Sequence, residues 1–427
     1  MFLLYITFPS IQSDAPPSFH AFRDRYHLGS HWLTAVCLMR GGVKKSLHNH
    51  YPGVVWWSSG LRSSSELKTC PDGSRCYFFH HEDRNIPKNV GAYLFYASGM
   101  NFEDLPLPRR PDHVIWAIFH EESPRNVAEL MFEKVLNLFN YSSTFSRFSD
   151  VPFPLAHMKS LDDLTSKRYY VKTSDKNALL NEISPILFLQ SDCDTSTERE
   201  EYVKELMKFV NIDSYGECLN NKQLPDSLKI DYLNKLHDDE TLSFIAKYKF
   251  VIAIENGVCE DYVTEKLWRA ISVGTIPIYF GSPSIKDWLP NNKTAILLED
   301  YPTPKILSNY INKLMKNDSL YEQHLEHKIK GFITNKNLLS EIELRPYQLD
   351  ALDTLYTYEC FICKQLYSTD KKNKHNIVSK AHYNCPKPIS ALTLAVNPKS
   401  LWVNMWEYSA RDVDKLYERI LKQEPPQ

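Results

Sequence analysis

The sequence lacks several features that would place it at once in a particular class of protein. Its 427 residues contain no apolar run of the roughly 20 residues that a membrane-spanning helix needs. The formal net charge is only −2, so charge gives no argument for a nucleic-acid or polyanionic partner. No segment recurs at the period of a solenoid repeat. These absences favour an ordinary globular chain, and the length predicts two to three domains.

The start of the chain also lacks a clear targeting signal. Phe2–Phe8 is apolar but short for a signal peptide, and no basic residues precede it. Three explanations stay open: a longer N-terminal anchor that is missing from this sequence, a soluble protein, or a weak signal over Met1–Ser13. Residues 1–47 have mixed character and predict no particular fold.

Cysteine, in contrast, is well represented, and it occurs together with glycosylation sequons. The nine cysteines are Cys37, Cys70, Cys76, Cys193, Cys218, Cys259, Cys360, Cys363 and Cys385. The three Asn-x-Ser/Thr sequons begin at Asn140, Asn292 and Asn317. Disulfides persist in the lumen of the secretory pathway, and sequons mark N-glycosylation there. The two features together favour the endoplasmic reticulum or Golgi lumen.

The stretch Lys249–Pro290 organises the chain. Phe250–Ile254 is a short apolar, β-branched run that predicts a buried strand. Thr264 can cap a helix with apolar residues at helical spacing, and Gly274 is placed to end that helix. Thr275–Phe280 predicts a second strand. Strand, helix and strand in this order are typical of a parallel α/β sheet.

Polar residues gather between the first of these strands and the first turn of the helix. They are Asn256, Tyr262, Glu265 and Lys266. Ligands of α/β sheets bind at the carboxyl ends of strands, where helix N-termini point. A diphosphate there would meet backbone N–H groups, the positive helix end and the Lys266 ammonium. A carboxylate beside it could hold sugar hydroxyls.

A second strand-to-helix junction occurs earlier in the chain. Val114–Phe119 predicts a strand, and Arg125–Leu138 has helical spacing. Ser123 fits the N-cap and Pro124 the first helical position. Glu122 therefore lies where a strand ends and a helix begins, on the ligand-facing edge of another α/β sheet.

The remaining pattern predicts two α/β domains and a cysteine-bearing extension. Further strands are predicted at residues 54–57, 93–96 and 185–190, and helices at 197–209 and 305–330; residues 159–176 read as a linker. We divide the chain into residues 1–47 of uncertain structure, an N-terminal acceptor-side domain (48–178), a C-terminal donor-binding domain (179–346) and an extension (347–427).

Two groups of motifs carry a resemblance to a known family. FxxxxEN, DYVTEKLW and GSPS in the organising stretch resemble the donor motif of the family 10 glycosyltransferases, the α1,3/4-type fucosyltransferases. HEESP and STFSRFSDVPFP resemble the N-terminal domain of that family. The similarity covers roughly residues 50–365, and ECFIC and GSPSIKDWLPNN are most similar to the protein O-fucosyltransferase branch.

This resemblance implies a fold, a donor and a set of site residues. The fold is GT-B, in which two Rossmann-like domains face each other across a cleft. The reaction is an inverting displacement from GDP-fucose that requires no metal cofactor. By motif position, Glu122 matches the catalytic base, Arg199 a donor-phosphate arginine, and Asn256, Tyr262, Glu265 and Lys266 the donor site. One departure is Gly257, where the family usually has serine.

The resemblance also implies how the cysteines pair. In the family the C-terminal Cys-x-x-Cys is tied to N-terminal cysteines, so Cys360 and Cys363 are expected to pair with Cys70 and Cys76. Cys193–Cys218 is a local pair, and elimination leaves Cys259–Cys385 with Cys37 free. A zinc site at Cys360, Cys363, His382 and Cys385 is the alternative, and the spacing alone does not decide.

Several alternatives stay open at this point. The acceptor could be Ser or Thr of extracellular EMI-type protein domains, or N-acetylglucosamine of a glycan. The chain could also be a non-catalytic binding protein with a nucleotide-sugar fold, or use another nucleotide sugar. Each site residue has a plainer role: Glu122 could favour a helix N-terminus, Lys266 could be a solvated charge, Tyr262 could be core, and Arg199 could pair with Glu198 or Glu201. Glu121 is expected at the surface.

Overall fold

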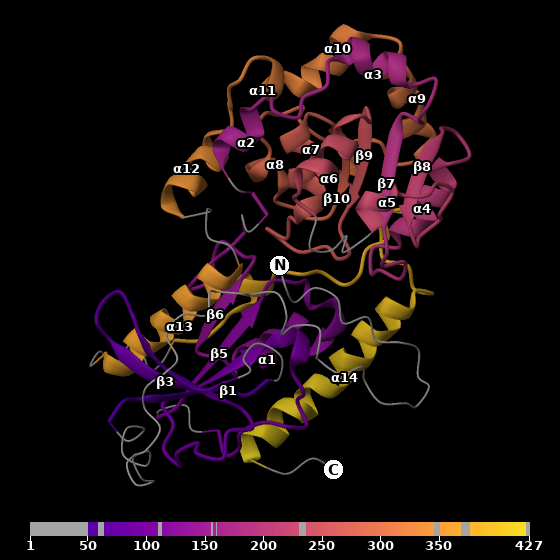
Figure 1. Ribbon diagram of the computed structural model, residues 1–427. Coiled ribbons are helices and arrows are strands. Elements are labelled where there is room, and N and C mark those ends of the chain that lie inside the picture. Colours follow the sequence, from indigo (N-terminus) through magenta and orange to yellow (C-terminus); the bar gives the residue numbers. More distant parts are fainter. Residues whose placement is uncertain are drawn as a thin grey trace.

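The computed structural model describes residues 50–58, 64–109, 113–154, 157–158, 160–229, 236–345, 351–368 and 376–423. The N-terminal segment 1–47 and its Cys37 lie outside the described residues. Figure 1 shows two α/β units, one above the other, with the C-terminal part of the chain returning to the lower unit. Among the described residues no helix is both long and apolar enough to cross a membrane.

The first unit is built on a six-stranded sheet with the order β2-β3-β1-β4-β5-β6. All of its pairs are parallel except β2 with β3. The strands are β1 Gly53–Trp56, β2 Glu66–Thr69, β3 Arg75–His80, β4 Ala92–Tyr96, β5 Ile115–His120 and β6 Tyr141–Thr144. The central strands β1 and β5 are buried almost throughout, as expected for apolar strands covered on both faces. The predicted strands at 54–57, 93–96 and 114–119 are therefore confirmed.

The prediction of one helix over Arg125–Leu138 is wrong. The chain instead forms two short 3₁₀ turns, η4 Pro124–Asn126 and η5 Ala128–Met131, and one turn of α-helix, α1 Glu133–Leu136. Non-helical backbone at Val127 and Phe132 separates these turns. Ser123 makes no capping bond, and its hydroxyl donates to a side chain of the other domain.

The second unit is built on a five-stranded, wholly parallel sheet with the order β11-β10-β9-β7-β8. Its strands are β7 Ile186–Gln190, β8 Ile212–Gly216, β9 Phe250–Ile254, β10 Ile276–Phe280 and β11 Ile296–Leu297. Its helices are α4 Arg199–Leu206, α5 Asp226–Lys229, α6 Asp239–Ala246, α7 Glu265–Val273, α8 Ile285–Trp288, α9 Pro304–Met315, α10 Asp318–Glu322, α11 Glu326–Ile329 and α12 Lys336–Leu344. Two separate, mainly parallel sheets with helices are the architecture of the predicted GT-B fold.

Helix α7 begins and ends at the residues that the sequence predicts. The Thr264 hydroxyl accepts a hydrogen bond from the Lys266 N–H, and so caps the first turn. Gly274 has a left-handed backbone with φ of 73° and donates to the carbonyls of Ala270 and Ile271. The continuous helix expected at 305–330 is instead broken into α9, α10 and α11.

The crossing between the domains comes earlier than the predicted boundary at residue 178. Helix α2 Leu161–Thr165 packs against α7 and α11 of the second unit, and helix α3 Thr173–Leu179 is hydrogen-bonded to the same unit. Lys176 of α3 donates to the carbonyls of Tyr248 and Gly274, at 2.7 and 2.8 Å. Residues 161–178 therefore belong with the donor-side domain, although their charged composition reads as a linker.

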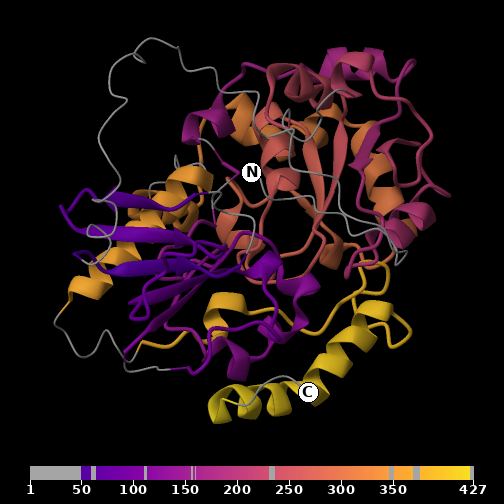
Figure 2. The ribbon, with the colours of Figure 1, turned by 60° about the horizontal axis from the view of Figure 1, so that its bottom comes forward.

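The C-terminal extension is joined to both units by disulfide bonds. Helix α13 Ala351–Tyr367 packs on the first sheet, where the disulfides Cys70–Cys360 and Cys76–Cys363 tie it down. The turn η10 Lys380–Tyr383 follows, and Cys385 is bonded to Cys259 of the second unit. Helix α14 Leu401–Lys422 then runs along the first unit (Figures 1 and 2).

Candidate functional site

The predicted base and two predicted donor-site residues meet between the two domains. Glu122 is the second residue after β5 of the first sheet, and Asn256 is the second residue after β9 of the second. Oε2 of Glu122 accepts hydrogen bonds from the Tyr262 hydroxyl at 2.8 Å and from Nδ2 of Asn256 at 3.1 Å. The carboxyl ends of two parallel sheets thus contribute to one site, as the GT-B expectation requires.

The hydrogen bonds define which atoms of Glu122 remain available. Tyr262 is buried, and burial together with the nearby Glu122 charge raises the pKa of its hydroxyl well above the ordinary value. The hydroxyl therefore stays protonated and donates to the carboxylate. Both donors use Oε2, so among the described residues Oε1 keeps its capacity to accept a proton.

The domains approach each other closely beside this site. The Ser123 hydroxyl donates to Oδ1 of Asn256 across 3.1 Å, which fixes the orientation of the amide that reaches Glu122. A Cβ atom at Gly257 would lie only 2.8 Å from Oγ of Ser123. A serine at position 257 would therefore require Ser123 to shift, which is a physical reason for the departure from the family motif.

A buried charged cluster surrounds the N-terminus of α7. Nζ of Lys266 lies 3.2 Å from Oε1 of Glu265 and 3.5 Å from Oε2 of Glu255. Glu255 has no solvent exposure and accepts from the N–H and hydroxyl of Thr264, at 2.8 and 2.7 Å. Glu255 is not among the site residues predicted from the sequence, although its place directly after β9 is a usable signal. It fixes both the helix cap and the lysine.

The Glu265 carboxyl is ionised at neutral pH. Burial raises its pKa, but Lys266 and Arg269 oppose that effect, and the net result holds the pKa well below the ordinary value. An ionised carboxylate accepts hydrogen bonds only, which suits the sugar-hydroxyl role that the resemblance implies. His157 lies 4.0 Å from Glu265, but burial lowers the histidine pKa to about 4 and leaves it neutral.

Arg199 is placed differently from the other predicted donor residues. Its side chain is almost fully buried and donates to the carbonyls of Asp192 and Ile254, at 2.6 and 3.3 Å. It also pairs with Glu200 at 2.9 Å, whereas the plainer alternative from the sequence was a pair with Glu198 or Glu201. Arg199 therefore ties the end of β9 to the loop after β7. Its contact with a donor phosphate stays a prediction.

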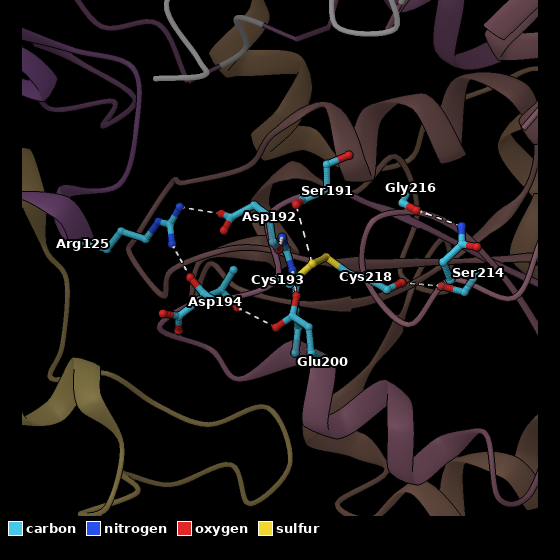
Figure 3. The surroundings of a disulfide bond; sticks show 12 residues. Arg125, Ser191, Asp192, Cys193, Asp194, Glu200, Ser214, Gly216 and Cys218 are labelled. Carbon is cyan, nitrogen blue, oxygen red and sulfur yellow. Dashed lines mark hydrogen bonds and ion pairs between the residues drawn. A yellow bond between two sulfur atoms is a disulfide. The ribbon is translucent and has the colours of Figure 1, made fainter. Parts of the chain in front are cut away.

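The loop after β7 is closed by a disulfide and contacted from the other domain. Cys193 is bonded to Cys218, the local pair that was expected (Figure 3). Arg125 of the first domain reaches this loop, donating to the carbonyl of Asp194 at 2.9 Å and pairing with Asp192. Asp192 is thus engaged by an arginine of the acceptor-side domain.

Glu121 does not lie at the surface as expected. Its Oε1 accepts from the Tyr96 hydroxyl at 2.7 Å, and its buried Oε2 has no hydrogen-bond partner among the residues that the structure describes. Burial, with a smaller contribution from the Glu122 charge, raises the pKa of Glu121 to about 7. The two adjacent carboxyl groups therefore have opposite environments: Glu121 is enclosed, and Glu122 faces the site.

One predicted glycosylation site is contradicted by its surroundings. Asn140 is 5% exposed, and its Oδ1 accepts from the Trp116 N–H and from Arg109, both at 2.9 Å. A glycan has no room on this side chain in the folded protein. Asn292 and Asn317 are exposed and stay candidates.

The fold and the site define the class of protein: a nucleotide-sugar glycosyltransferase with two α/β domains. Residues 49–156 match the family described as "Fucosyltransferase, N-terminal", and residues 181–381 match "Glycosyltransferase family 10 (fucosyltransferase) C-term". The chain belongs to this fucosyltransferase family, and it is an enzyme of the glycosyltransferase class.

Curated relatives cover most of the chain. A rat protein named "GDP-fucose protein O-fucosyltransferase 3" is 37% identical over 89% of this chain and 81% of its own. A Drosophila melanogaster protein named "Alpha-(1,3)-fucosyltransferase B" is 43% identical over 79% of this chain and 77% of its own. A solved alpha1,3-fucosyltransferase with GDP-fucose is similar at 17% identity and a TM-score of 0.41, covering 79% of this chain and 95% of its own.

Proposed function

We propose that this protein is an inverting fucosyltransferase that moves L-fucose from GDP-fucose to Ser or Thr of an extracellular, EMI-type protein domain. The observation that carries the proposal is the placement of Glu122. The carboxylate comes from the acceptor-side domain, is held by Asn256 and Tyr262 of the donor-side domain, and keeps Oε1 available. The name of the rat relative supports a protein hydroxyl as the acceptor.

The site residues account for each part of the reaction. The acceptor hydroxyl gives its proton to Oε1 of Glu122 as its oxygen bonds to the anomeric carbon of fucose. The bond from that carbon to the diphosphate breaks, and GDP leaves with the electron pair. Attack opposite the leaving group inverts the anomeric configuration. General-base assistance of this kind contributes roughly 10²–10⁴-fold to the rate.

The donor side stabilises the leaving group without a metal cofactor. Lys266 and the N-terminus of α7 supply positive charge, and Glu265 holds the sugar hydroxyls. Fixed cations in a site shielded from water can take the place of a divalent ion in neutralising a diphosphate. Addition of a chelator is therefore expected to leave the rate unchanged.

We place the enzyme in the lumen of the endoplasmic reticulum or Golgi. Four disulfides within one chain are typical of an oxidising compartment. Any membrane attachment would come from an N-terminal anchor, as in other members of the family.

The acceptor class is tested by offering the enzyme two acceptors. GDP-fucose is incubated with a folded EMI domain or with N-acetyllactosamine, and fucosylated product is measured by mass spectrometry. Transfer to the protein domain is expected. Transfer only to the glycan would contradict the proposed acceptor and favour the activity in the name of the Drosophila relative. Binding of GDP without transfer to either would indicate a non-catalytic binding protein, and tight binding of a non-GDP nucleotide would indicate another donor.

The base assignment is tested by Glu122→Gln. The amide keeps the size of the side chain but cannot take a proton, so the rate of transfer is expected to fall by about 10²–10⁴-fold with GDP affinity retained. Glu82→Gln is the matched control, because Glu82 is an exposed glutamate at the end of another strand of the same sheet. A Glu122→Gln enzyme as active as the wild type would show that the base lies elsewhere.

A further inference from the structure

A segment of the acceptor-side domain contacts the loop between β9 and α7 of the donor-side domain. It is Phe145–Arg147, which directly follows β6. The Arg147 guanidinium lies against Asp261, with Nη2 2.7 Å from Oδ1 and Nε 3.0 Å from Oδ2. The backbone N–H of Arg147 also donates to Oδ2 at 3.0 Å. This two-pronged contact is the geometry in which arginine and a carboxylate bind most strongly.

Asp261 is held in a conformation that costs energy. Its φ is 63°, in the left-handed region that residues other than glycine rarely adopt. Its backbone N–H donates to the hydroxyls of Ser282 and Ser284, each at 2.9 Å. Its Oδ1 additionally accepts from Ser284 at 2.7 Å and from the Trp288 indole at 3.1 Å. The contacts with Arg147 are therefore part of what keeps this backbone turned.

The same segment also contacts the next residue, Tyr262. The Phe145 ring packs edge-on against the Tyr262 ring, with centroids 5.0 Å apart. Tyr262 in turn donates its hydroxyl to Glu122 at 2.8 Å. Phe145 and Arg147 thus contact two consecutive residues of the donor-side loop. One of the two, Tyr262, is hydrogen-bonded to Glu122.

We infer that Arg147 is a positioning residue for fucosyl transfer: by clamping Asp261 it fixes Tyr262, and through it the Glu122 carboxylate, in the reactive alignment between the domains. Arg147 touches neither the donor nor the acceptor in this role. Errors of about 1 Å in such an alignment can lower a rate by about 10²-fold.

The surroundings of Arg147 favour a fixed geometry over a mobile charge. Its side chain is 14% exposed, and that of Asp261 is 1% exposed. Asp287 lies 3.0 Å away and Glu341 3.5 Å away, while the guanidinium packs over Trp288 at 4.5 Å. Lysine could supply the charge but not the planar fork that meets two oxygens at once.

The inference rests on the proposed function, and the experiment separates the two. Steady-state kinetics of Arg147→Ala and Arg147→Lys are measured in transfer and in hydrolysis of GDP-fucose to fucose and GDP. Hydrolysis needs no acceptor, so it tests alignment of the base even if the proposed acceptor is wrong. We expect kcat to fall about 10²-fold for alanine and less for lysine, with the Kd for GDP within about threefold of wild type.

A matched control separates alignment from general stability. Lys134→Ala removes another ion pair, Lys134–Asp414, whose side chains are 57% and 63% exposed, and it should leave kcat unchanged. If the alanine variant of Arg147 does not fold, Asp261→Asn replaces it, because the amide keeps the shape while losing the charge. A kcat of wild-type size in either variant would overturn the inference.

The double variant Arg147→Ala/Tyr262→Phe shows whether Arg147 acts through Tyr262. If it does, the double variant is no slower than Tyr262→Phe alone, because the contact that Arg147 positions is already absent. Rate losses that multiply would mean that the two residues act independently, and the assigned role would be wrong.

Discussion

Two adjacent carboxyl groups at the end of β5 have different chemistry because their environments differ. Glu122 meets polar donors from the other domain, whereas Glu121 turns into the protein and meets Tyr96. Sequence alone assigned the surface position to Glu121, because charged residues are rarely enclosed. The pattern HEES does not say which of the two neighbouring side chains faces the other domain, since both lie within two residues of the end of the strand.

The buried Glu121 predicts a pH dependence of stability. Its pKa rises to about 7 in the folded protein, above the ordinary value of 4.5, so the folded state binds the proton more tightly than the unfolded state does. The resulting stabilisation is complete below pH 4.5 and is lost as pH rises to 7. At most about 3 kcal/mol is involved. Glu121→Gln should therefore gain stability relative to the wild type as pH rises to 7.

Thermal unfolding of the wild type and Glu121→Gln, measured from pH 5 to pH 8, checks this prediction. The difference between the two unfolding midpoints should change in favour of the glutamine variant as pH rises. Glu418→Gln provides the control, because Glu418 is 66% exposed and pairs with Lys422 rather than with a histidine, so its replacement should shift both ends of the range equally. A constant difference between Glu121→Gln and wild type would mean that Glu121 does not titrate there.

At the scale of elements, local signals predicted α7 but not the turns after β5. Thr264 and Gly274 are a cap and a stop that act within their own helix. Ser123 and Pro124 form an equally good local signal, yet the Ser123 hydroxyl bonds Asn256 of the other domain. A partner more than a hundred residues away is invisible to spacing rules, so contacts between domains account for this error.

Ser123, just before η4, lies so close to Gly257 in the loop after β9 that a larger residue at position 257 is expected to lower the activity. Gly257→Ser places a Cβ 2.8 Å from Oγ of Ser123, so Asn256 or the Ser123 turn must move and the Glu122 contact is disturbed. We expect kcat/KM to fall about tenfold or more, since small displacements at a reacting centre are costly.

Removing the opposing side chain tests whether the clash is the cause. Ser123→Gly in the Gly257→Ser background should recover activity to the level of Ser123→Gly alone, measured by the same transfer assay. That single variant is the necessary reference, because it also loses the hydrogen bond to Asn256. A Gly257→Ser enzyme with wild-type kcat/KM would show that the loop adapts without disturbing the site.

At the scale of the whole molecule, the extension makes the two domains one unit. Cysteine positions and the family resemblance predicted all four bonded pairs that the structure contains. The domain boundary at 178 was misplaced, because the charged side of α3 hides the contacts of Lys176 with the donor-side sheet. Composition describes the exposed face of such a segment and says little about which sheet it covers.

The two disulfides that hold α13 predict that their contributions to the free energy of unfolding are not additive when they are removed. Cys70–Cys360 and Cys76–Cys363 each span about two thirds of the 427-residue chain, with separations of 290 and 287 residues. With one of the two disulfides in place, the second closes only a short loop in the unfolded chain and stabilises the fold by about 3 kcal/mol. Without the second disulfide, the remaining one closes a long loop and stabilises the fold by about 5–6 kcal/mol. Replacing Cys76 and Cys363 by serine should thus cost about 3 kcal/mol, and replacing all four about 8–9 kcal/mol. Denaturant unfolding gives these values, and a four-serine variant that loses only twice as much as the two-serine one would contradict the loop-closure argument.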